Sequence, residues 1–301
     1  MGFGRSIMPR ADKLFGQAPS LAWTWARCML FMAALICPWS AQAGCPSPEK
    51  TIYLTFDTGH MGVAPLIAEV LQRHAVPVTF FAAHEPTQTG DGSLGDAWAP
   101  WWAQAAAQGH AFASHTHDHA YWLADLPARE GQPQFRIRPS AGAMKGKTLH
   151  WSAAQYCEEL HRASRRLAQL TGQTPLPLFR APGGKTSPSL LQVARSCGYL
   201  HVGWAPAGFL GDELPSEKYP NRELLAQALS NIRGGDVLVA HLGIWSRQDP
   251  WAPAVLEPLI LGLKRRGLCF ATLREHPQMR PWITEQGGAT LARRLQSERG
   301  S

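Results

Sequence analysis

The sequence predicts an α/β fold, a distorted or incomplete barrel of parallel strands with helices on the outside. Strand and helix signals alternate along most of the chain. About seven β/α units occupy about 230 residues, which is close to the size of a barrel domain. The chain has 301 residues, of which 45% are hydrophobic and 17% charged, so it can bury a sizeable core. The absence of a repeat of about 20–50 residues argues against a solenoid or a propeller.

The expected strands are short runs of β-branched, aromatic and aliphatic residues. The first reads TIYLTF and the second PVTFFA, and both are typical of strands buried in a parallel sheet. In chain order, the expected strands are 51–56, 77–82, 110–115, 178–180, 199–204, 236–241 and 268–273.

The expected helices have apolar residues at a spacing of three or four. The clearest of them spans 152–171, where Ser152 can act as the N-cap and Gly172 can end the helix. Asn221 is expected to cap another helix. In chain order, the expected helices are 63–75, 98–108, 152–171, 187–197, 221–232 and 252–266.

Two segments depart from this alternation. Within an expected catalytic domain of 44–275, residues 120–151 are interpreted as a long inserted loop, of a length that is usually functional or mobile. The loop contains five basic residues, namely Arg129, Arg136, Arg138, Lys145 and Lys147. They would either face an anionic polymer or form ordinary solvated surface. Residues 276–301 are expected to be a polar, frayed tail.

Residues 1–43 have the order of a secretory signal peptide. An apolar run from Cys28 to Cys37 follows basic residues and precedes the small-residue site Ala41-Gln42-Ala43. The run is short for a transmembrane helix, so we expect cleavage after Ala43 and export to the periplasm or the exterior, with no stable membrane span afterwards. The alternatives are an uncleaved anchor and a lipoprotein attached at Cys45, although Gln42 stands where a lipoprotein signal has an aliphatic residue.

The net charge of +7 overstates the charge of the exported domain. Residues 1–43 contribute +3 of it, because they contain four basic residues and one acidic residue. No Lys/Arg run with interleaved aromatic residues marks a nucleic-acid surface, so we expect no nucleic-acid partner.

Four cysteines remain after the expected cleavage: Cys45, Cys157, Cys197 and Cys269. In an oxidising compartment they can form disulfides in three ways, and buried free thiols are the alternative. No CxxC pair is present, which argues against a cysteine zinc site.

Four of the expected strands end in a polar residue, where an apolar core residue would otherwise be expected: Asp57, His115, Arg180 and His241. In barrels of this kind, the functional residues lie at the carboxyl ends of the strands. His115 belongs to the run SHTHDH, and His119 follows it four residues later. Imidazole is a common zinc ligand, so this pair is a candidate metal site, with His117 pointing elsewhere.

The other strand ends carry further candidates. Asp57 is followed by Thr58-Gly59, whose glycine allows a tight turn. Arg180 precedes the turn Ala181-Pro182-Gly183-Gly184, and such a turn can present backbone N–H groups to an oxyanion.

Together these residues resemble the polysaccharide deacetylase family, the NodB-homology domain of carbohydrate esterase family four, from about residue 50 to about 275. The family motif TFDDG is similar to Thr55-Phe56-Asp57-Thr58-Gly59, and H-[ST]-x-x-H is similar to His115-Thr116-His117-Asp118-His119. The motif R-x-P-x-G is similar to 180–184, and the strand ending in histidine is similar to Leu238-Val239-Ala240-His241.

The resemblance implies a metal-dependent hydrolase that removes N-acetyl groups from an amino-sugar polymer such as chitin or peptidoglycan. It implies Asp57 as general base, His241 as general acid and Arg180 as the residue that orients the base. It further implies His115 and His119 as ligands of a divalent metal, most simply zinc, and the Gly183 amide as an oxyanion donor.

Two positions depart from the family pattern. Thr58 stands where the family has a metal-binding Asp, so His60, Asp57 or Asp118 would have to supply the missing ligand, or Thr58 would bond a metal-bound water. The fourth motif lacks the acid that pairs with the arginine, because Trp204 is followed by Ala-Pro-Ala-Gly; Asp212 or Asp236 would replace it.

These departures leave two alternatives, a catalytically weakened carbohydrate-binding pseudoenzyme and a hydrolase of a non-sugar amide. Tryptophans provide flat faces that suit sugar rings, although most are expected in the core. Trp204 and Trp245 are the candidates for substrate contact, Trp245 because it lies just beyond His241.

Overall fold

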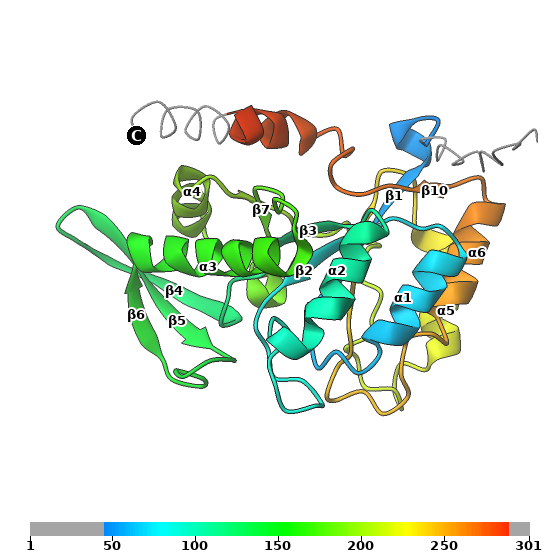
Figure 1. The fold of residues 1–301 in the computed structure, drawn as a ribbon, viewed down its shortest axis with the longest axis horizontal. Helices are drawn as coiled ribbons and strands as arrows, with labels where there is room; N and C mark the ends of the chain where they lie inside the picture. Colours follow the sequence, from blue (N-terminus) through cyan, green and yellow to red (C-terminus); the bar gives the residue numbers. More distant parts are fainter. Residues whose placement is uncertain (1–44, 289–301) are drawn as a thin grey trace, which may run out of the picture. The chain divides into compact units, whose positions relative to one another are not determined.

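The computed structural model describes residues 45–288 (Figure 1). The expected signal peptide and residues 289–301 of the expected tail lie outside these residues. The central sheet consists of β1 (Thr51–Asp57), β2 (Thr79–Ala82), β3 (Ala111–Ser114), β7 (Leu178–Phe179), β8 (Leu200–His201), β9 (Val237–His241) and β10 (Cys269–Phe270). Its strands are parallel, in the order β10-β1-β2-β3-β7-β8, and β9 pairs with β1.

Helices follow the strands, as the alternation predicted. They are α1 (Ala64–Arg73), α2 (Ala99–Ala107), α3 (Ala153–Thr171), α4 (Pro188–Ser196), α5 (Asn221–Asn231) and α6 (Leu256–Arg265). Short 3-10 turns lie at Pro48–Lys50, Asp96–Trp98 and Pro182–Gly184. No helix in the described part of the chain is long and apolar enough to cross a membrane.

The segment that follows β8 connects the two ends of the sheet, because it forms hydrogen bonds first with β7 and then with β9. The Val202 amide donates to the Phe179 carbonyl (2.8 Å), next to β7. Three residues later, the Ala205 amide donates to the Val237 carbonyl (3.0 Å) at the start of β9. A parallel bridge between Phe209 and Val239 continues this contact. The sheet is therefore curled into the incomplete barrel that the sequence predicted.

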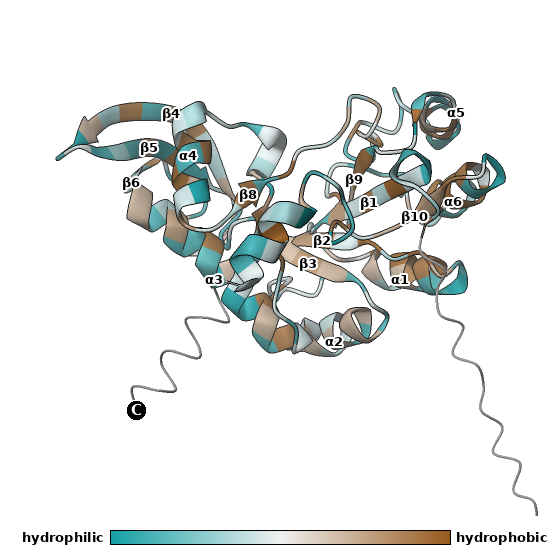
Figure 2. Ribbon diagram, turned by 90° about the horizontal axis from the view of Figure 1, so that it is seen from above, coloured by the Kyte–Doolittle hydropathy of each residue, from teal (hydrophilic) through white to brown (hydrophobic). Residues whose placement is uncertain are grey.

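Strand β1 is buried along its whole length. Its alternate residues Ile52, Leu54 and Phe56 belong to a core cluster with α1, α5 and α6, whereas Tyr53 packs in a second cluster on the other face. A strand that is covered on both faces needs apolar residues at nearly every position, which explains the run TIYLTF. Figure 2 shows the apolar colour of the central strands between the helices.

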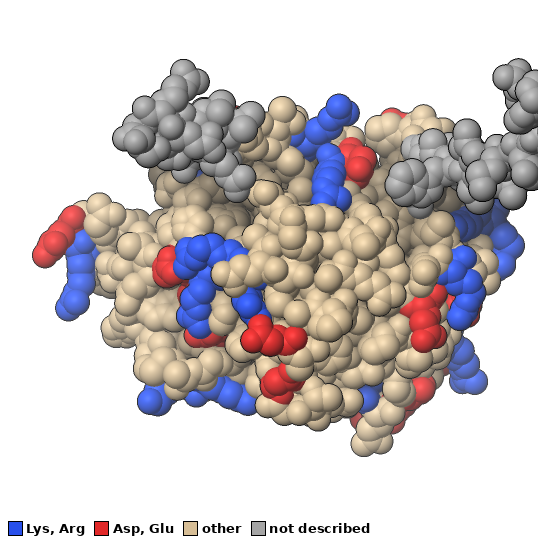
Figure 3. Space-filling model, in the orientation of Figure 1, with Lys and Arg blue, Asp and Glu red and all other residues tan. Residues whose placement is uncertain are grey.

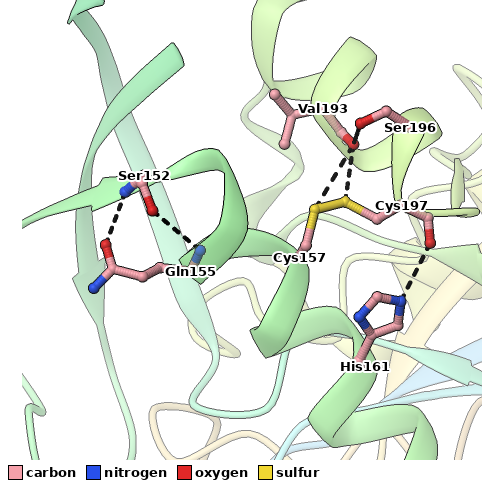
Figure 4. Close-up of a disulfide and its surroundings, with 7 residues drawn as sticks. All are labelled: Ser152, Gln155, Cys157, His161, Val193, Ser196 and Cys197. Carbon is pink, nitrogen blue, oxygen red and sulfur yellow. Dashed lines mark hydrogen bonds between the residues drawn. A yellow bond between two sulfur atoms is a disulfide. The ribbon is translucent and has the colours of Figure 1, made fainter. Parts of the chain in front are cut away.

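Helix α3 begins and ends where the sequence predicted. Ser152 and Gln155 form a capping box, in which the Gln155 amide donates to Ser152 Oγ (3.3 Å) and the Ser152 amide donates to Gln155 Oε1 (2.8 Å; Figure 4). Gly172 ends the helix with a φ of 66°. For α5 the expected cap is wrong, because Pro220 is the N-cap and the Asn221 side chain donates to Asp249 instead (2.8 Å).

The segment interpreted as a long loop is an antiparallel sheet. It consists of β4 (Ala120–Arg129), β5 (Gln132–Pro139) and β6 (Leu149–Ser152). Phe135 and Ile137 of β5 are buried against α3 and α4, whereas Arg136 and Arg138 are exposed. β5 contains no continuous apolar run, because a strand with one solvent-exposed face alternates between polar and apolar residues, and the sequence therefore did not predict it.

The beginning of the expected tail is also ordered. Residues 280–288 are helical. Trp282 Nε1 donates to the Pro177 carbonyl (2.9 Å), and Trp282 and Ile283 pack against the buried cluster that includes Leu178 of β7. The prediction of a frayed tail from residue 276 is therefore wrong for this part, because one tryptophan and one isoleucine supply enough apolar surface to dock it.

The four cysteines form two disulfides, Cys45–Cys269 and Cys157–Cys197. The first joins the start of the described chain to β10, and the second joins α3 to the end of α4 (Figure 4). Of the three possible connectivities, the structure thus selects one.

Candidate active site

The four polar residues at strand ends lie together at the carboxyl edge of the sheet. Asp57 and His241 end the neighbouring strands β1 and β9 and are register partners. His115 follows β3, and its Nε2 lies 3.6 Å from Asp57 Oδ2. Arg180 follows β7 and contacts the other oxygen of Asp57. Parallel strands all end at the same edge, so four residues that are far apart in sequence converge.

Asp57 is a buried carboxylate, and the guanidinium of Arg180 and the imidazole rings of His115 and His241 surround it. Arg180 Nη1 donates to Asp57 Oδ1 at 2.6 Å. Burial would raise the pKa of the Asp57 carboxyl, but Arg180, His115 and His241 outweigh it and hold this pKa below its usual value. Asp57 is therefore ionised at neutral pH, as a general base must be.

Arg180 is completely buried and is held by backbone carbonyls. Its Nε donates to the Val202 carbonyl (3.1 Å) and its Nη2 to the Gly203 carbonyl (3.2 Å). The guanidinium carbon lies 4.2 Å from the centre of the Phe81 ring and 5.7 Å from that of Trp204. Carbonyls and aromatic faces thus replace the acidic partner that the fourth motif lacks.

The expectation that Asp212 or Asp236 pairs with Arg180 is wrong. Asp212 is bound to His241, and Asp236 accepts a hydrogen bond from the Arg233 amide (2.8 Å). Both carboxylates lie beside β9. Asp212 accepts hydrogen bonds from His241 at the end of this strand, and Asp236 accepts one within the turn that precedes it.

His241 is paired with Asp212. Its Nδ1 donates to the two carboxylate oxygens at 3.1 and 3.2 Å, and its own amide donates to Asp212 Oδ2 at 2.6 Å. Burial works against the charged ring, but Asp212, followed by Asp57 and Glu213, raises the pKa of His241 to about 10. The ring is therefore an imidazolium at neutral pH and can donate a proton.

His115 and His119 lie side by side, with ring centres 4.8 Å apart. His115 Nδ1 donates to the Arg180 carbonyl (2.9 Å), which leaves Nε2 without a proton. Burial lowers the pKa of His115 to about 4, so this ring is neutral at pH 7. His119 Nδ1 lies 2.5 Å from Ser140 Oγ. His117 instead contacts Asp118 (2.8 Å), in agreement with the expectation that it points elsewhere.

Thr58 does not face an open space but binds a carboxylate that the sequence analysis missed. Thr58 Oγ1 donates to Glu85 Oε2 at 2.6 Å. The other oxygen of Glu85 lies 3.9 Å from His119 Nδ1. Glu85 stands three residues beyond the end of β2, the neighbour of β1, at the same edge of the sheet. Its place after a strand end was the signal that could have found it.

Among residues 45–288, no group of three or more His, Cys, Asp or Glu side chains is arranged to hold a metal ion. The expected pair His115 and His119 is nevertheless present, with each Nδ1 engaged by a neighbour. Metal-ligating imidazoles are typically held this way, so that Nε2 is free to bind. The two imidazoles can therefore act as donors to a divalent cation, but within residues 45–288 no third ligating side chain is placed beside them.

The turn after β7 is shaped by two glycines. Gly183 has a φ of 65°, and a Cβ there would lie 2.9 Å from the Tyr121 ring. Gly184 has a φ of 67°, and its Cβ would lie 2.7 Å from the Trp204 ring. The turn therefore fits closely between two aromatic side chains, and Tyr121 also contacts the His119 ring (5.0 Å between centres). Gly183 and Trp204 thus border the site.

A cavity of about 330 Å³ lies beside His241. Asp212, His60 and Arg247 are among the residues that line it. Trp245, 64% exposed, stands edge-on to His60 with 5.1 Å between ring centres. Trp245 thus presents an exposed aromatic ring next to His60, which is one of the residues that line this cavity.

Comparison with known proteins finds the sequence profile of polysaccharide deacetylases over residues 45–202. The chain is 27% identical over 236 residues to a chitooligosaccharide deacetylase of Azorhizobium caulinodans, covering 75% of this chain and 93% of that protein. It is 25% identical over 229 residues to the peptidoglycan-N-acetylmuramic acid deacetylase PdaA of Bacillus subtilis, covering 75% and 70% of the two chains.

Solved structures show the same fold at low sequence identity. A peptidoglycan N-acetylglucosamine deacetylase matches with a TM-score of 0.55 and 20% identity, covering 77% of this chain and 89% of the other. An acetyl xylan esterase of Clostridium thermocellum with a cobalt ion matches with 0.55 and 20%, covering 75% and 89%. A pseudoenzyme of Bacillus anthracis matches with 0.54 and 16%, covering 76% and 66%.

Proposed function

The chain belongs to the polysaccharide deacetylase family, and from this we propose that it removes N-acetyl groups from an amino-sugar polymer or oligosaccharide. The proposal rests on one observation: the ionised carboxylate of Asp57 and the positively charged imidazolium of His241 lie next to each other on neighbouring strands. Two ionisable groups whose pKa values are pushed apart in one site are the arrangement that general base and general acid catalysis requires.

In the proposed reaction, Asp57 takes a proton from the attacking water. The oxygen of that water forms a bond to the acetyl carbon, and the negative charge moves to the carbonyl oxygen. The Gly183 amide stabilises this oxyanion. His241 then gives its proton to the nitrogen of the sugar as the C–N bond breaks, which yields acetate and a free amine. Arg180 keeps Asp57 in position and ionised.

Deacetylases of this family are generally metal-dependent. His115 and His119 would hold the cation through Nε2, and zinc is the metal that we propose. When bound, such a cation polarises the acyl carbonyl and makes a water easier to deprotonate. The chain's own contribution is to hold both imidazoles with their Nδ1 atoms engaged.

Chitooligosaccharide and peptidoglycan are the substrate classes that the similar deacetylases favour. The exposed indole of Trp245 and the cavity beside His241 would accommodate sugar rings, because flat aromatic faces pack well against them. Trp204 would contact the sugar on the other side, next to the Gly183 turn.

Acetate release tests the proposal. Purified protein with added Zn²⁺ or Co²⁺ is expected to release acetate from chitooligosaccharides or peptidoglycan fragments. Asp57→Asn should lower kcat by about 10²–10⁴-fold, because it removes the base without changing the shape of the side chain. Acetate release that neither this substitution nor a chelator affects would refute the proposal. If the protein hydrolyses simple non-sugar amides and no acetylated sugar, the alternative substrate class is favoured.

A second candidate function is glycan binding without turnover. Thr58 favours this candidate, because the family has a metal-binding Asp at this position. The potential metal ligands among residues 45–288 also form no group of three, which agrees with a protein that binds glycan without hydrolysing it. Binding of the same oligosaccharides with no acetate released at any metal concentration would support this candidate instead.

We further propose that the protein is exported and cleaved after Ala43. Two disulfides support this, since such bonds persist mainly in oxidising compartments. N-terminal sequencing of the protein recovered from the periplasm or medium should begin at Gly44.

A further inference from the structure

We propose that the cavity beside His241 is a subsite for a carboxylate carried by the substrate, and that Arg247 and Trp251 recognise this carboxylate. Both residues line the cavity and lie in the loop between β9 and α6. The inference rests on the proposed deacetylation. It narrows the substrate class to amino sugars that carry an acidic substituent.

Arg247 is a buried cation without an acidic partner. Its residue is 8% exposed, and within residues 45–288 no Asp or Glu lies at ion-pair distance from its guanidinium. Its Nη atoms donate instead to the carbonyls of Leu214 (2.6 Å) and Tyr219 (3.2 Å) and to Asn221 Oδ1 (2.6 Å). These neutral acceptors hold the guanidinium in place but do not neutralise its charge.

Two N–H groups of the cavity-lining residues have no acceptor. Arg247 Nε and Trp251 Nε1 are both buried, and neither donates a hydrogen bond to any group among residues 45–288. Trp251 as a whole is only 3% exposed. A buried donor without an acceptor is costly, so a ligand that brings oxygen atoms to these donors would remove that cost.

The charges around the cavity favour an anion over a neutral acceptor. Asp212 is the acidic residue of the lining, and both of its carboxylate oxygens accept from His241 Nδ1 (3.1 and 3.2 Å). The imidazolium of His241 and the guanidinium of Arg247 thus provide two positive charges against one negative charge. An uncharged oxygen would satisfy the donors only, whereas a carboxylate would also balance the remaining positive charge.

The cavity lies where a substituent of the reacting sugar would be found. His241 lines it, and this ring is the group proposed to protonate the sugar nitrogen. Substituents on the carbon atoms next to the one that bears this nitrogen therefore come close to the cavity. Its volume of about 330 Å³ is sufficient for a small acidic side group.

Binding of two matched probes tests the inference. The probes are N-acetylmuramic acid, an amino sugar with a carboxylate on its ether substituent, and its methyl amide, which is similar in shape and uncharged. Isothermal titration at pH 7 gives the Kd of each. Every protein also carries Asp57→Asn, so that neither probe is consumed. This reference protein is compared with its Arg247→Gln, Trp251→Phe and Arg222→Gln derivatives.

The quantity to compare is the ratio of the two Kd values. We expect the reference protein to bind the acid at least about tenfold more tightly than the amide. The ratio should fall close to one in Arg247→Gln and several-fold in Trp251→Phe, which removes an N–H but keeps an aromatic ring in the core. It should not change in Arg222→Gln, an exposed arginine on α5. A disturbed loop would weaken both probes alike, so the ratio separates recognition from support of the loop.

Three results would overturn the inference. Equal affinity for the acid and the amide in the reference protein would mean that the cavity does not recognise a carboxylate. A ratio that stays high in every variant that folds would mean that other residues recognise it. Both results leave the proposed deacetylation in place. If neither probe binds, the inference fails, and acetate release from chitooligosaccharides by the wild type decides separately whether the proposed function fails with it.

Discussion

At the scale of single residues, the environment separates the charge states of Asp57 and His241. Arg180 and the neighbouring imidazoles stabilise the carboxylate, whereas Asp212 stabilises the imidazolium. Each group carries the charge that its proposed role needs over a wide range of pH. Burial lowers the pKa of His115 and makes this ring neutral. At His241 the hydrogen-bonded carboxylate of Asp212 outweighs burial, so the pKa of this ring is raised instead.

This contrast predicts the effect of Asp212→Asn on the pH profile. Asp212 raises the pKa of His241 to about 10, so the acid form persists up to about that pH. Without the carboxylate, burial favours the neutral ring and the pKa falls. The alkaline limb of kcat/KM should therefore move to lower pH, by more than one unit, while the acidic limb set by Asp57 changes less.

Glu213→Gln is the matched control, because Glu213 acts on His241 only as a more distant charge. It should move the alkaline limb much less than Asp212→Asn does. An alkaline limb that stays in place in Asp212→Asn would show that His241 is not the group that titrates in the reaction.

At the scale of elements, the antiparallel β4–β6 sheet extends from the site and carries unpaired positive charge. Arg129, Arg136, Arg138, Lys145 and Lys147 are exposed, and none of them forms an ion pair with a residue of the described chain. Arg138 is the register partner of Tyr121, which contacts the His119 ring. Figure 3 shows basic side chains along the lower left margin, where Figure 1 places this sheet.

A strip of exposed cations that begins beside the site should favour an anionic polymer over a neutral one. We therefore expect Arg136→Gln/Arg138→Gln to raise KM several-fold for anionic peptidoglycan fragments at low salt, because each exposed charge contributes about 1 kcal/mol or less. KM for neutral chitooligosaccharides should not change. The difference should vanish near 1 M salt, where the Debye length is only about 3 Å.

Arg222→Gln, an exposed arginine on α5, provides the control for a change in net charge alone. If it raises KM for the anionic fragments as much as the double substitution does, the β4–β6 sheet has no special role in binding.

At the scale of the whole molecule, two disulfides join segments that are distant in sequence. Cys45 and Cys269 are separated by 224 residues, and Cys157 and Cys197 by 40. The longer loop attaches the beginning of the described chain to β10, beside Thr51 of β1. A cross-link stabilises mainly by restricting the unfolded chain, and the restriction grows slowly with loop length.

Removal of either disulfide should therefore destabilise the protein by a similar amount. Cys45→Ser/Cys269→Ser and Cys157→Ser/Cys197→Ser should each lower the free energy of unfolding by about 2–4 kcal/mol, as measured by urea denaturation of the purified protein. The wild type should show no free thiols at these four positions. A variant as stable as the wild type would mean that its cysteines are not bonded in the native protein.

The order of strands and helices and the catalytic candidates could be inferred from the amino-acid sequence alone. Periodicity is a local property, so the order of strands and helices could be read directly, and Asp57, His115, Arg180 and His241 stood out because each closes an apolar strand. The segments that the sequence misjudged were β4–β6 and the helical residues 280–288. β5 was missed because a strand with one solvent-exposed face has no continuous apolar run.

The contacts between side chains that are distant in sequence could be seen only in the folded protein. Thr58 and Glu85 are 27 residues apart in sequence. Arg180 binds Asp57 and the backbone carbonyls after β8, and it binds neither Asp212 nor Asp236. Asp212 instead pairs with His241. These contacts depend on how neighbouring strands align and where the loops beyond them turn. Distances across strands are not encoded in any local pattern, and for that reason the carboxylate beside the two imidazoles came from an unexpected place in the chain.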